Sequence, residues 1–190
     1  RWRALKPGDR VEVSSKSGNT YAATLVAAGR DEAGLYVRLA NGLLARLLPS
    51  RLNWKTLKRL GTEDAVKKGD EAILIALGGD AKRGKLVDVL DDRVVLSLPK
   101  GGTQTVAVGG EEEKRFRLLF PATDLRKGDE FIVQSVSGRE FHGIAVSVAP
   151  DKIVAEMRPS RAPTTLRVDR LDLKTLHVLI PVRGVTTTWS

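Results

Sequence analysis

The stretch Leu5-Lys6-Pro7-Gly8-Asp9-Arg10-Val11-Glu12-Val13 is the first of three related stretches in this chain. It returns as Val66-Lys67-Lys68-Gly69-Asp70-Glu71-Ala72-Ile73-Leu74 and as Leu125-Arg126-Lys127-Gly128-Asp129-Glu130-Phe131-Ile132-Val133. The three Gly-Asp pairs lie 61 and 59 residues apart, since their aspartates are residues 9, 70 and 129. A fixed period of about sixty residues indicates structural repeats.

Each copy has a physical reason to begin a strand. Glycine accepts positive φ and aspartate can hydrogen-bond its own downstream backbone, so Gly-Asp forms a tight turn. After the first turn, Val11 and Val13 alternate with Arg10 and Glu12, which is the period of a half-buried strand. The motif therefore predicts a turn followed by a strand at the start of every repeat.

The first and third repeats also end alike. Arg51-Leu52-Asn53-Trp54-Lys55-Thr56-Leu57 matches Arg170-Leu171-Asp172-Leu173-Lys174-Thr175-Leu176, which lies 119 residues later. The middle repeat ends in Lys114-Arg115-Phe116-Arg117-Leu118-Leu119-Phe120 and has lost this match. We therefore predict three domains: residues 1–62, a diverged second repeat at 63–122, and residues 123–190, which include a C-terminal tail after Ile180.

Alternating patterns and turn residues predict an all-β chain with five short strands in each repeat. In the first repeat the strands are expected near 9–14, 20–28, 34–40, 43–48 and 54–60. In the second they are expected near 70–77, 85–90, 93–98, 103–108 and 114–120. In the third they are expected near 129–136, 140–148, 152–158, 164–168 and 173–180. Pro49-Ser50-Arg51-Leu52 predicts a helical turn before the last strand, and Gly109–Glu113 a flexible acidic loop at the equivalent place.

These features together resemble the Tudor/SH3-like small-barrel superfamily, which includes KOW and bacterial SH3-type modules. The resemblance covers all three repeats and rests on the basic-Gly-Asp opening, the strand spacing and the Pro-Ser-Arg-Leu turn. It implies three tandem, five-stranded SH3-like or Tudor-like small barrels. It also implies a module that binds RNA, DNA, peptides or methylated side chains, because such barrels mostly serve in binding.

No pattern in the sequence points to catalysis. Gly79-Asp80-Ala81-Lys82-Arg83-Gly84-Lys85-Leu86 comes close to a phosphate-binding P-loop, but Leu86 stands where a magnesium-binding Ser or Thr is needed. The two histidines, His142 and His177, fall in expected strands without the spacing of a metal site or a nucleophile–base pair. We therefore predict no enzyme, no catalytic or metal-binding residue, no cofactor and no small-molecule substrate.

Composition leaves the location of the protein open. The chain has no cysteine, which excludes disulfides and favours a reducing compartment. No apolar run approaches the roughly 18 residues of a membrane helix, so we expect no membrane partner. The chain runs from Arg1, without a methionine, to Ser190, and we expect it to be a piece of a longer protein.

The positive charge is concentrated in the first repeat. Residues 1–62 carry 12 Lys and Arg against 4 Asp and Glu, which gives +8 of the total +9. Residues 63–122 carry 10 against 11, which gives −1, and residues 123–190 carry 10 against 8, which gives +2. A local basic surface attracts polyanions, so the first repeat is the expected binding repeat.

Six basic residues of the first repeat lie in its third to fifth expected strands and their connections: Arg38, Arg46, Arg51, Lys55, Lys58 and Arg59. Such side chains would contact phosphates and supply affinity without sequence specificity. Their common face depends on strand register. If Leu57 points inward then Lys58 points outward, and a slip of one residue inverts the set. The sequence leaves both registers open.

Three functions remain, in order of preference. The first is a non-enzymatic binding module whose basic first repeat contacts the backbone of RNA or DNA, with the other repeats as spacer and docking surface. The alternative is a structural protein whose barrels bind other proteins, with the charge facing an acidic segment. The third is a reader of methylated tails, in which Tyr21, Tyr36 and Trp54 would form an aromatic cage. Core packing is the commoner use of such aromatic residues.

Overall fold

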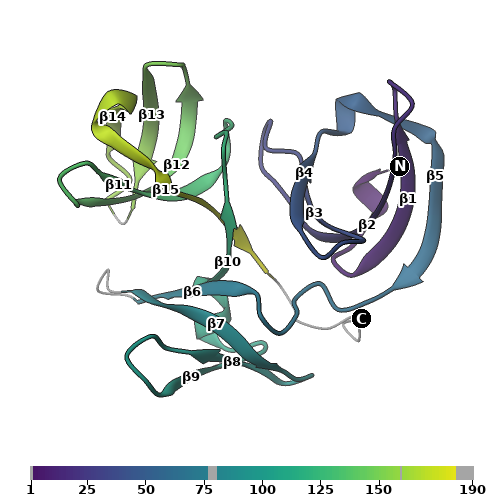
Figure 1. Cartoon of the computed structure of the whole chain (residues 1–190), viewed down its shortest axis with the longest axis horizontal. Coiled ribbons are helices and arrows are strands. Elements are labelled where there is room, and N and C mark those ends of the chain that lie inside the picture. The colour runs from purple at the N-terminus through teal and green to yellow at the C-terminus, as the bar shows by residue number, and fades with distance from the viewer. Residues whose placement is uncertain (1, 77–80, 159, 183–190) are drawn as a thin grey trace. The chain divides into compact units, whose positions relative to one another are not determined.

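The computed structural model describes residues 2–76, 81–158 and 160–182, and in these the chain is built from strands and short 3-10 helices (Figure 1). The predicted all-β class is therefore confirmed. The chain divides into two compact units. Unit 1 comprises the described parts of Arg1–Ala28, Gly34–Leu118 and Pro181–Ser190, and unit 2 comprises Gly29–Ala33 and Leu119–Ile180.

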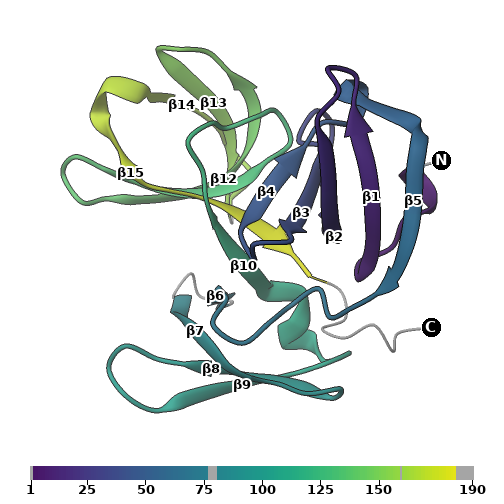
Figure 2. The same ribbon diagram turned by 45° about the vertical axis from the view of Figure 1, so that its right-hand side comes forward.

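Unit 1 begins with the 3-10 helix η1 (Trp2–Ala4) and five antiparallel strands in the order β4-β3-β2-β1-β5. The strands are β1 (Asp9–Ser15), β2 (Thr20–Ala28), β3 (Leu35–Leu39), β4 (Leu44–Leu47) and β5 (Leu52–Thr62), with η2 (Pro49–Arg51) before β5. Figure 2 shows β5 running along β1. Alternate side chains of these strands bury a hydrophobic cluster of Val13, Ala23, Leu25, Leu35, Val37, Leu47 and Leu52.

The next five strands of the chain have the same order, β9-β8-β7-β6-β10. They are β6 (Glu71–Ile75), β7 (Ala81–Val89), β8 (Arg93–Ser97), β9 (Thr103–Ala107) and β10 (Phe116–Pro121), with η3 (Glu111–Arg115) before β10. Their buried side chains include Leu86, Leu96, Val106, Phe116 and Leu118. The first three residues of β10 pair with β6 inside unit 1, and its last three belong to unit 2.

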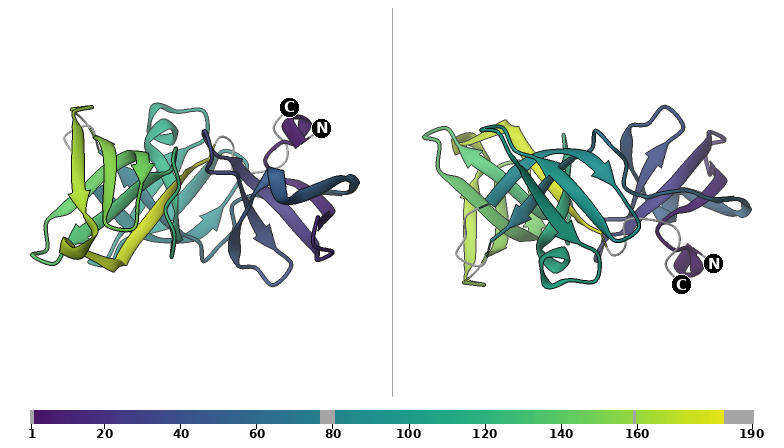
Figure 3. Two further views of the ribbon diagram at one scale, coloured as in Figure 1. Left: turned by 90° about the horizontal axis from the view of Figure 1, so that it is seen from above. Right: turned by 90° about the horizontal axis from the view of Figure 1, so that it is seen from below.

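Unit 2 holds the third set of strands in the order β14-β13-β12-β11-β15, with the end of β10 beside β15. They are β11 (Glu130–Ser135), β12 (Glu140–Val148), β13 (Lys152–Met157), β14 (Pro163–Arg167) and β15 (Leu171–Pro181), with η4 (Val168–Arg170) before β15. In Figure 3 the yellow strand β15 runs obliquely across the green strands of this unit. Phe131, Val133, Ala155, Leu166 and Val178 are among its buried side chains.

All fifteen strands of the described chain lie where the sequence predicts them, to within four residues at either end. The strand order is the same in the three sets, and a 3-10 helix precedes each fifth strand. The strands join into two sheets because β10 is shared, and among the described residues neither sheet closes into the barrel that we expected. The domain boundaries near residues 62 and 122 fall at the ends of β5 and β10 and stay a prediction.

The segment expected to be a flexible acidic loop contains a 3-10 helix instead. η3 begins at Glu111, directly after Gly109 and Gly110, and occupies the position that η2 and η4 hold in the other sets of strands. The carboxylate of Glu113 accepts a hydrogen bond from the backbone N–H of Gly109 at 2.5 Å, and Lys114 lies 3.1 Å from Glu111. These local contacts satisfy charges that the sequence pattern left without partners.

The Gly-Asp motif forms the same turn three times. The glycine has positive φ in each copy: 94° at Gly8, 89° at Gly69 and 93° at Gly128. In each copy the aspartate carboxylate accepts the backbone N–H of the residue three positions earlier. The distances are 2.8 Å from Lys6 to Asp9, 2.9 Å from Lys67 to Asp70 and 2.8 Å from Arg126 to Asp129. The carboxylate therefore bonds the upstream backbone, not the downstream backbone that we predicted.

Candidate nucleic-acid interface

The structure decides the register of β5. Leu57 packs against the core of the first set of strands, and Lys58 lies opposite Glu12 of β1, whose neighbours Val11 and Val13 are buried. Lys58 therefore points away from the core, as the first of the two registers requires. Arg59 lies opposite Val11, on the other face of β5, and its guanidinium is 3.5 Å from the carboxylate of Asp9.

Four of the six predicted basic residues are exposed to solvent: Arg51, Lys55, Lys58 and Arg59. The side chains of Arg51, Lys55 and Lys58 make no hydrogen bond, ion pair or ring contact with the part of the chain that the structure describes. Arg59 remains 56% exposed despite its contact with Asp9. These side chains are thus available to a ligand, although Lys58 and Arg59 leave β5 from opposite faces.

Lys16 joins this group and was missed by sequence reasoning. It is an exposed residue in the turn between β1 and β2, and its backbone N–H donates to the carbonyl of Arg51 at 2.8 Å. The strands expected near 9–14 and 20–28 leave Lys16 in the connection between them, but the sequence gives no signal that this connection lies against η2. We call Lys16, Arg51, Lys55, Lys58 and Arg59 the basic edge, because in the described sheet β5 has β1 as its one hydrogen-bonded neighbour.

A local irregularity of β5 explains much of the ending shared by the first and third repeats. The pairing of β1 with β5 shifts register between Glu12 and Ser14. At this point the Thr56 hydroxyl donates to the carbonyl of Asn53 at 2.7 Å and accepts the Ser14 N–H at 2.9 Å. The Asn53 side chain accepts the Lys55 N–H at 3.2 Å. Asn53 and Thr56 are therefore needed for the backbone, whereas the Lys55 side chain is not.

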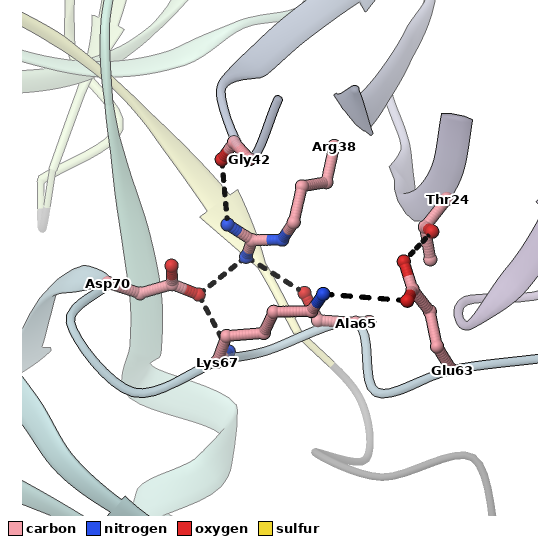
Figure 4. A network of polar contacts seen from close by, with 7 residues as sticks. All are labelled: Thr24, Arg38, Gly42, Glu63, Ala65, Lys67 and Asp70. Atoms are coloured by element: carbon pink, nitrogen blue, oxygen red, sulfur yellow. Dashed lines mark hydrogen bonds and ion pairs between the residues drawn. The ribbon is translucent and has the colours of Figure 1, made fainter. Parts of the chain in front are cut away.

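Arg38 is buried, so its side chain is not free to contact a ligand as the prediction requires. Its side chain is 6% exposed, and one guanidinium nitrogen donates to the Asp70 carboxylate at 2.6 Å and to the Ala65 carbonyl at 3.1 Å (Figure 4). The other terminal nitrogen donates to the Gly42 carbonyl at 3.3 Å. Asp70 is the turn aspartate of the second Gly-Asp motif and is itself only 9% exposed. Arg38 is therefore a structural residue that holds the segment after β5 against β3.

The same segment is held at a second point. The Thr24 hydroxyl donates to the carboxylate of Glu63, and Lys67 lies 3.4 Å from that carboxylate (Figure 4). The hydrogen bond from Thr24 lowers the pKa of Glu63, burial acts in the opposite direction, and the positive charge of Lys67 lowers the pKa further. Glu63 is therefore ionised at neutral pH, and the residues that follow β5 are fastened to β2 as well as to β3.

Arg46 and the expected aromatic cage also differ from prediction. Arg46 is half-buried on β4, and its guanidinium carbon lies 5.4 Å from the centroid of the Tyr36 ring. Tyr36 is 3% exposed, while Tyr21 and Trp54 pack against the hydrophobic cluster. The Trp54 indole N–H donates to the Pro49 carbonyl at 2.9 Å. The three rings fill the fold and do not form an open box for a methylated cation.

The other sequence features give no catalytic arrangement. Gly79 and Asp80 lie outside the described residues, and Lys82–Leu86 belong to strand β7, not to the helix start that a P-loop requires. His142 lies 3.1 Å from Glu130, and a ring nitrogen of His177 lies 2.9 Å from the Thr175 carbonyl. In the described ranges no group of three or more His, Cys, Asp or Glu side chains is placed to hold a metal ion.

Comparisons with known proteins leave the function open. No protein-family model and no curated protein matches the chain. Among the described elements, none of the helices has the length and apolar character required to cross a lipid bilayer.

Proposed function

We propose that the chain is a non-enzymatic binding module of three tandem SH3-like small barrels, and that its first repeat holds a nucleic-acid backbone through the basic edge. The strand order that recurs three times, each time with a 3-10 helix before the fifth strand, supports the tandem barrels. The boundaries proposed for them are residues 62 and 122.

The exposure of the basic edge is the observation that carries this function. The fold uses Arg38 for a buried ion pair and Arg46 for a ring contact, but it leaves Lys16, Arg51, Lys55 and Lys58 in solvent without a described partner. Phosphate oxygens accept hydrogen bonds from such groups, and each phosphate neutralised releases condensed counterions. Contacts of this kind position a nucleic acid without reading its sequence.

Two other roles fit basic residues on β5. Lysines on an edge strand prevent it from pairing with a second sheet. A basic surface also attracts an acidic protein segment, which is the structural alternative. Neither role predicts that the chain binds nucleic acid with an affinity that falls steeply as the salt concentration rises. That salt dependence is therefore the property to measure.

The test is binding of the whole chain to a labelled nucleic acid, followed by fluorescence anisotropy over a series of salt concentrations. Log affinity should fall with log salt at about −0.9 per contact for a duplex and about −0.7 for a single strand, so five contacts give at most about −4.5. Replacing Lys16, Arg51, Lys55 and Lys58 with glutamine should remove most of the slope, because these side chains are exposed and support no described contact.

The matched control replaces four exposed lysines elsewhere in the chain with glutamine: Lys85, Lys100, Lys127 and Lys152. It changes the net charge by the same amount and should keep most of the slope. If the two variants lose the same amount of salt slope, total charge, and not the basic edge, drives binding. If neither RNA nor DNA binds at low salt while polyglutamate does, the proposal is wrong and the acidic-partner alternative replaces it.

A further inference from the structure

Unit 2 repeats the hydrogen bonds that Asn53 and Thr56 make with the backbone around Lys55. We call this arrangement the frame. The Thr175 hydroxyl donates to the Asp172 carbonyl at 2.6 Å and accepts the Gln134 N–H at 2.8 Å. The Asp172 carboxylate accepts the Lys174 N–H at 3.2 Å. The pairing of β11 with β15 shifts register between Ile132 and Gln134, as the pairing of β1 with β5 does at the equivalent place. Lys174 therefore has the same place in the irregular segment of β15 as Lys55 has in that of β5.

The turn that lies beside this segment is also the same. The hydroxyls of Ser135 and Ser137 are 2.7 Å apart, and those of Ser15 and Ser17 are 2.8 Å apart. The N–H of Val136 donates to the Arg170 carbonyl at 2.9 Å, just as the N–H of Lys16 donates to the Arg51 carbonyl. Arg170 thus occupies the position of Arg51 in the first repeat.

Arg170 and Lys174 are exposed, and neither side chain makes a hydrogen bond, ion pair or ring contact with the described residues of the chain. The backbone pattern accounts for Asp172 and Thr175, but it does not account for two basic side chains at these positions. On the same frame, Arg51 and Lys55 belong to the basic edge.

The surroundings in unit 2 are less positive. Val136, which is 72% exposed, replaces Lys16, and Asp172 replaces Asn53. His177 and Val178 replace Lys58 and Arg59. The formal charges of the basic edge and Asn53 sum to +5. At the equivalent positions of unit 2, with histidine counted as neutral, only Arg170, Lys174 and Asp172 are charged, and their formal charges sum to +1. Any anion would therefore be held more weakly in unit 2.

We infer that Arg170 and Lys174, at the junction of η4 and β15, form a second and weaker contact for the phosphate backbone of the same nucleic acid. This inference rests on the proposed function of the first repeat. Asp172 limits the second contact, because its carboxylate stands between the two basic residues in the chain and repels phosphate.

The sharpest test exchanges Asn53 and Asp172, which accept the equivalent backbone N–H but differ in charge. Asp172→Asn keeps a side-chain oxygen for the Lys174 N–H and removes the negative charge, so it should tighten nucleic-acid binding about two- to fivefold at low salt. Asn53→Asp adds that charge to the basic edge and should weaken binding by a similar factor. Circular dichroism of both variants should match that of the wild type, which checks that they are folded.

Removal of the second contact gives an independent measurement. Arg170→Gln with Lys174→Gln should lower the salt slope by up to about 2, while Lys127→Gln with Lys152→Gln, the same change of charge elsewhere in the third repeat, should lower it less. If Asp172→Asn leaves affinity unchanged, or the two pairs have equal effects, the second contact does not exist. The basic-edge variant would still lose its slope in that case, so the proposed function would stand. Wild-type protein that binds no nucleic acid overturns both.

Discussion

The buried ion pair of Arg38 and Asp70 allows a quantitative prediction about stability. Asp70→Asn preserves the size of the side chain and an oxygen for the Lys67 N–H, but it leaves the Arg38 guanidinium buried without a counter-charge. Removing one partner of a buried ion pair costs about 3–5 kcal/mol. Because asparagine still offers a dipole to Arg38, the expected loss is at the lower end, about 3 kcal/mol.

The first Gly-Asp turn supplies a matched control. Asp9→Asn alters the equivalent aspartate, which also accepts the N–H of the residue three positions earlier, at 2.8 Å. Its ion-pair partner Arg59 is 3.5 Å away and 56% exposed, so the pair belongs to the surface class that contributes about 0–1 kcal/mol. The turn is the same in both variants, and the difference between them therefore isolates the buried charge.

Urea denaturation, followed by tryptophan fluorescence, measures both losses. With a slope of about 1.5 kcal/mol per molar urea, Asp70→Asn should lower the midpoint by about 2 M and Asp9→Asn by less than about 0.7 M. A double-mutant cycle with Arg38→Met should show that the two substitutions are not additive, since the second removes a charge that the first has already stranded. If Asp70→Asn costs no more than Asp9→Asn, the ion pair is not the fastening that the structure indicates.

Two further predictions concern Glu63 and the irregular strand segments. The folded pKa of Glu63 is lowered, so its contribution to stability should be present above its unfolded pKa near 4.5 and disappear as the pH falls through the folded pKa. The stability difference between wild type and Glu63→Gln, measured from pH 7 to pH 2, should therefore shrink in acid, and a pH-independent difference would contradict the assignment. Thr56→Val and Thr175→Val should each cost about 1–3 kcal/mol in urea denaturation, because the N–H of Ser14 or Gln134 loses its acceptor. Thr56→Ser and Thr175→Ser keep the hydroxyl and should cost clearly less.

The strands were predictable because their signals are local. Alternation of apolar side chains and the Gly-Asp turns are read within a few residues, and the structure has a strand at every expected place. The concentration of charge in residues 1–62 drew attention to Arg51, Lys55, Lys58 and Arg59, and the structure shows that these four residues are exposed. The register of β5 was not predictable, because the irregularity at Asn53 and Thr56 changes which residues share a face.

Residues that depend on contacts distant in sequence were assigned wrongly. In the sequence Arg38 looks like any other basic strand residue, because its ion-pair partner Asp70 lies 32 positions later. Lys16 was overlooked for the same reason, because the sequence does not show that its turn lies against η2. Tyr21, Tyr36 and Trp54 come from different strands, as a cage requires, but the sequence does not say on which side of each strand the core lies.

The position of Asp70 also bears on where the first repeat can be cut from the chain. The period of the sequence places a boundary near residue 62, but the first repeat owes two of its fastenings to Glu63 and Asp70, which come after it. In a fragment of residues 1–62, the Arg38 guanidinium would lose Asp70 and the Thr24 hydroxyl would lose Glu63. A fragment that ends after β6 would retain both. A fragment that keeps these contacts is thus longer than the period, because the opening turn of the second repeat completes the first.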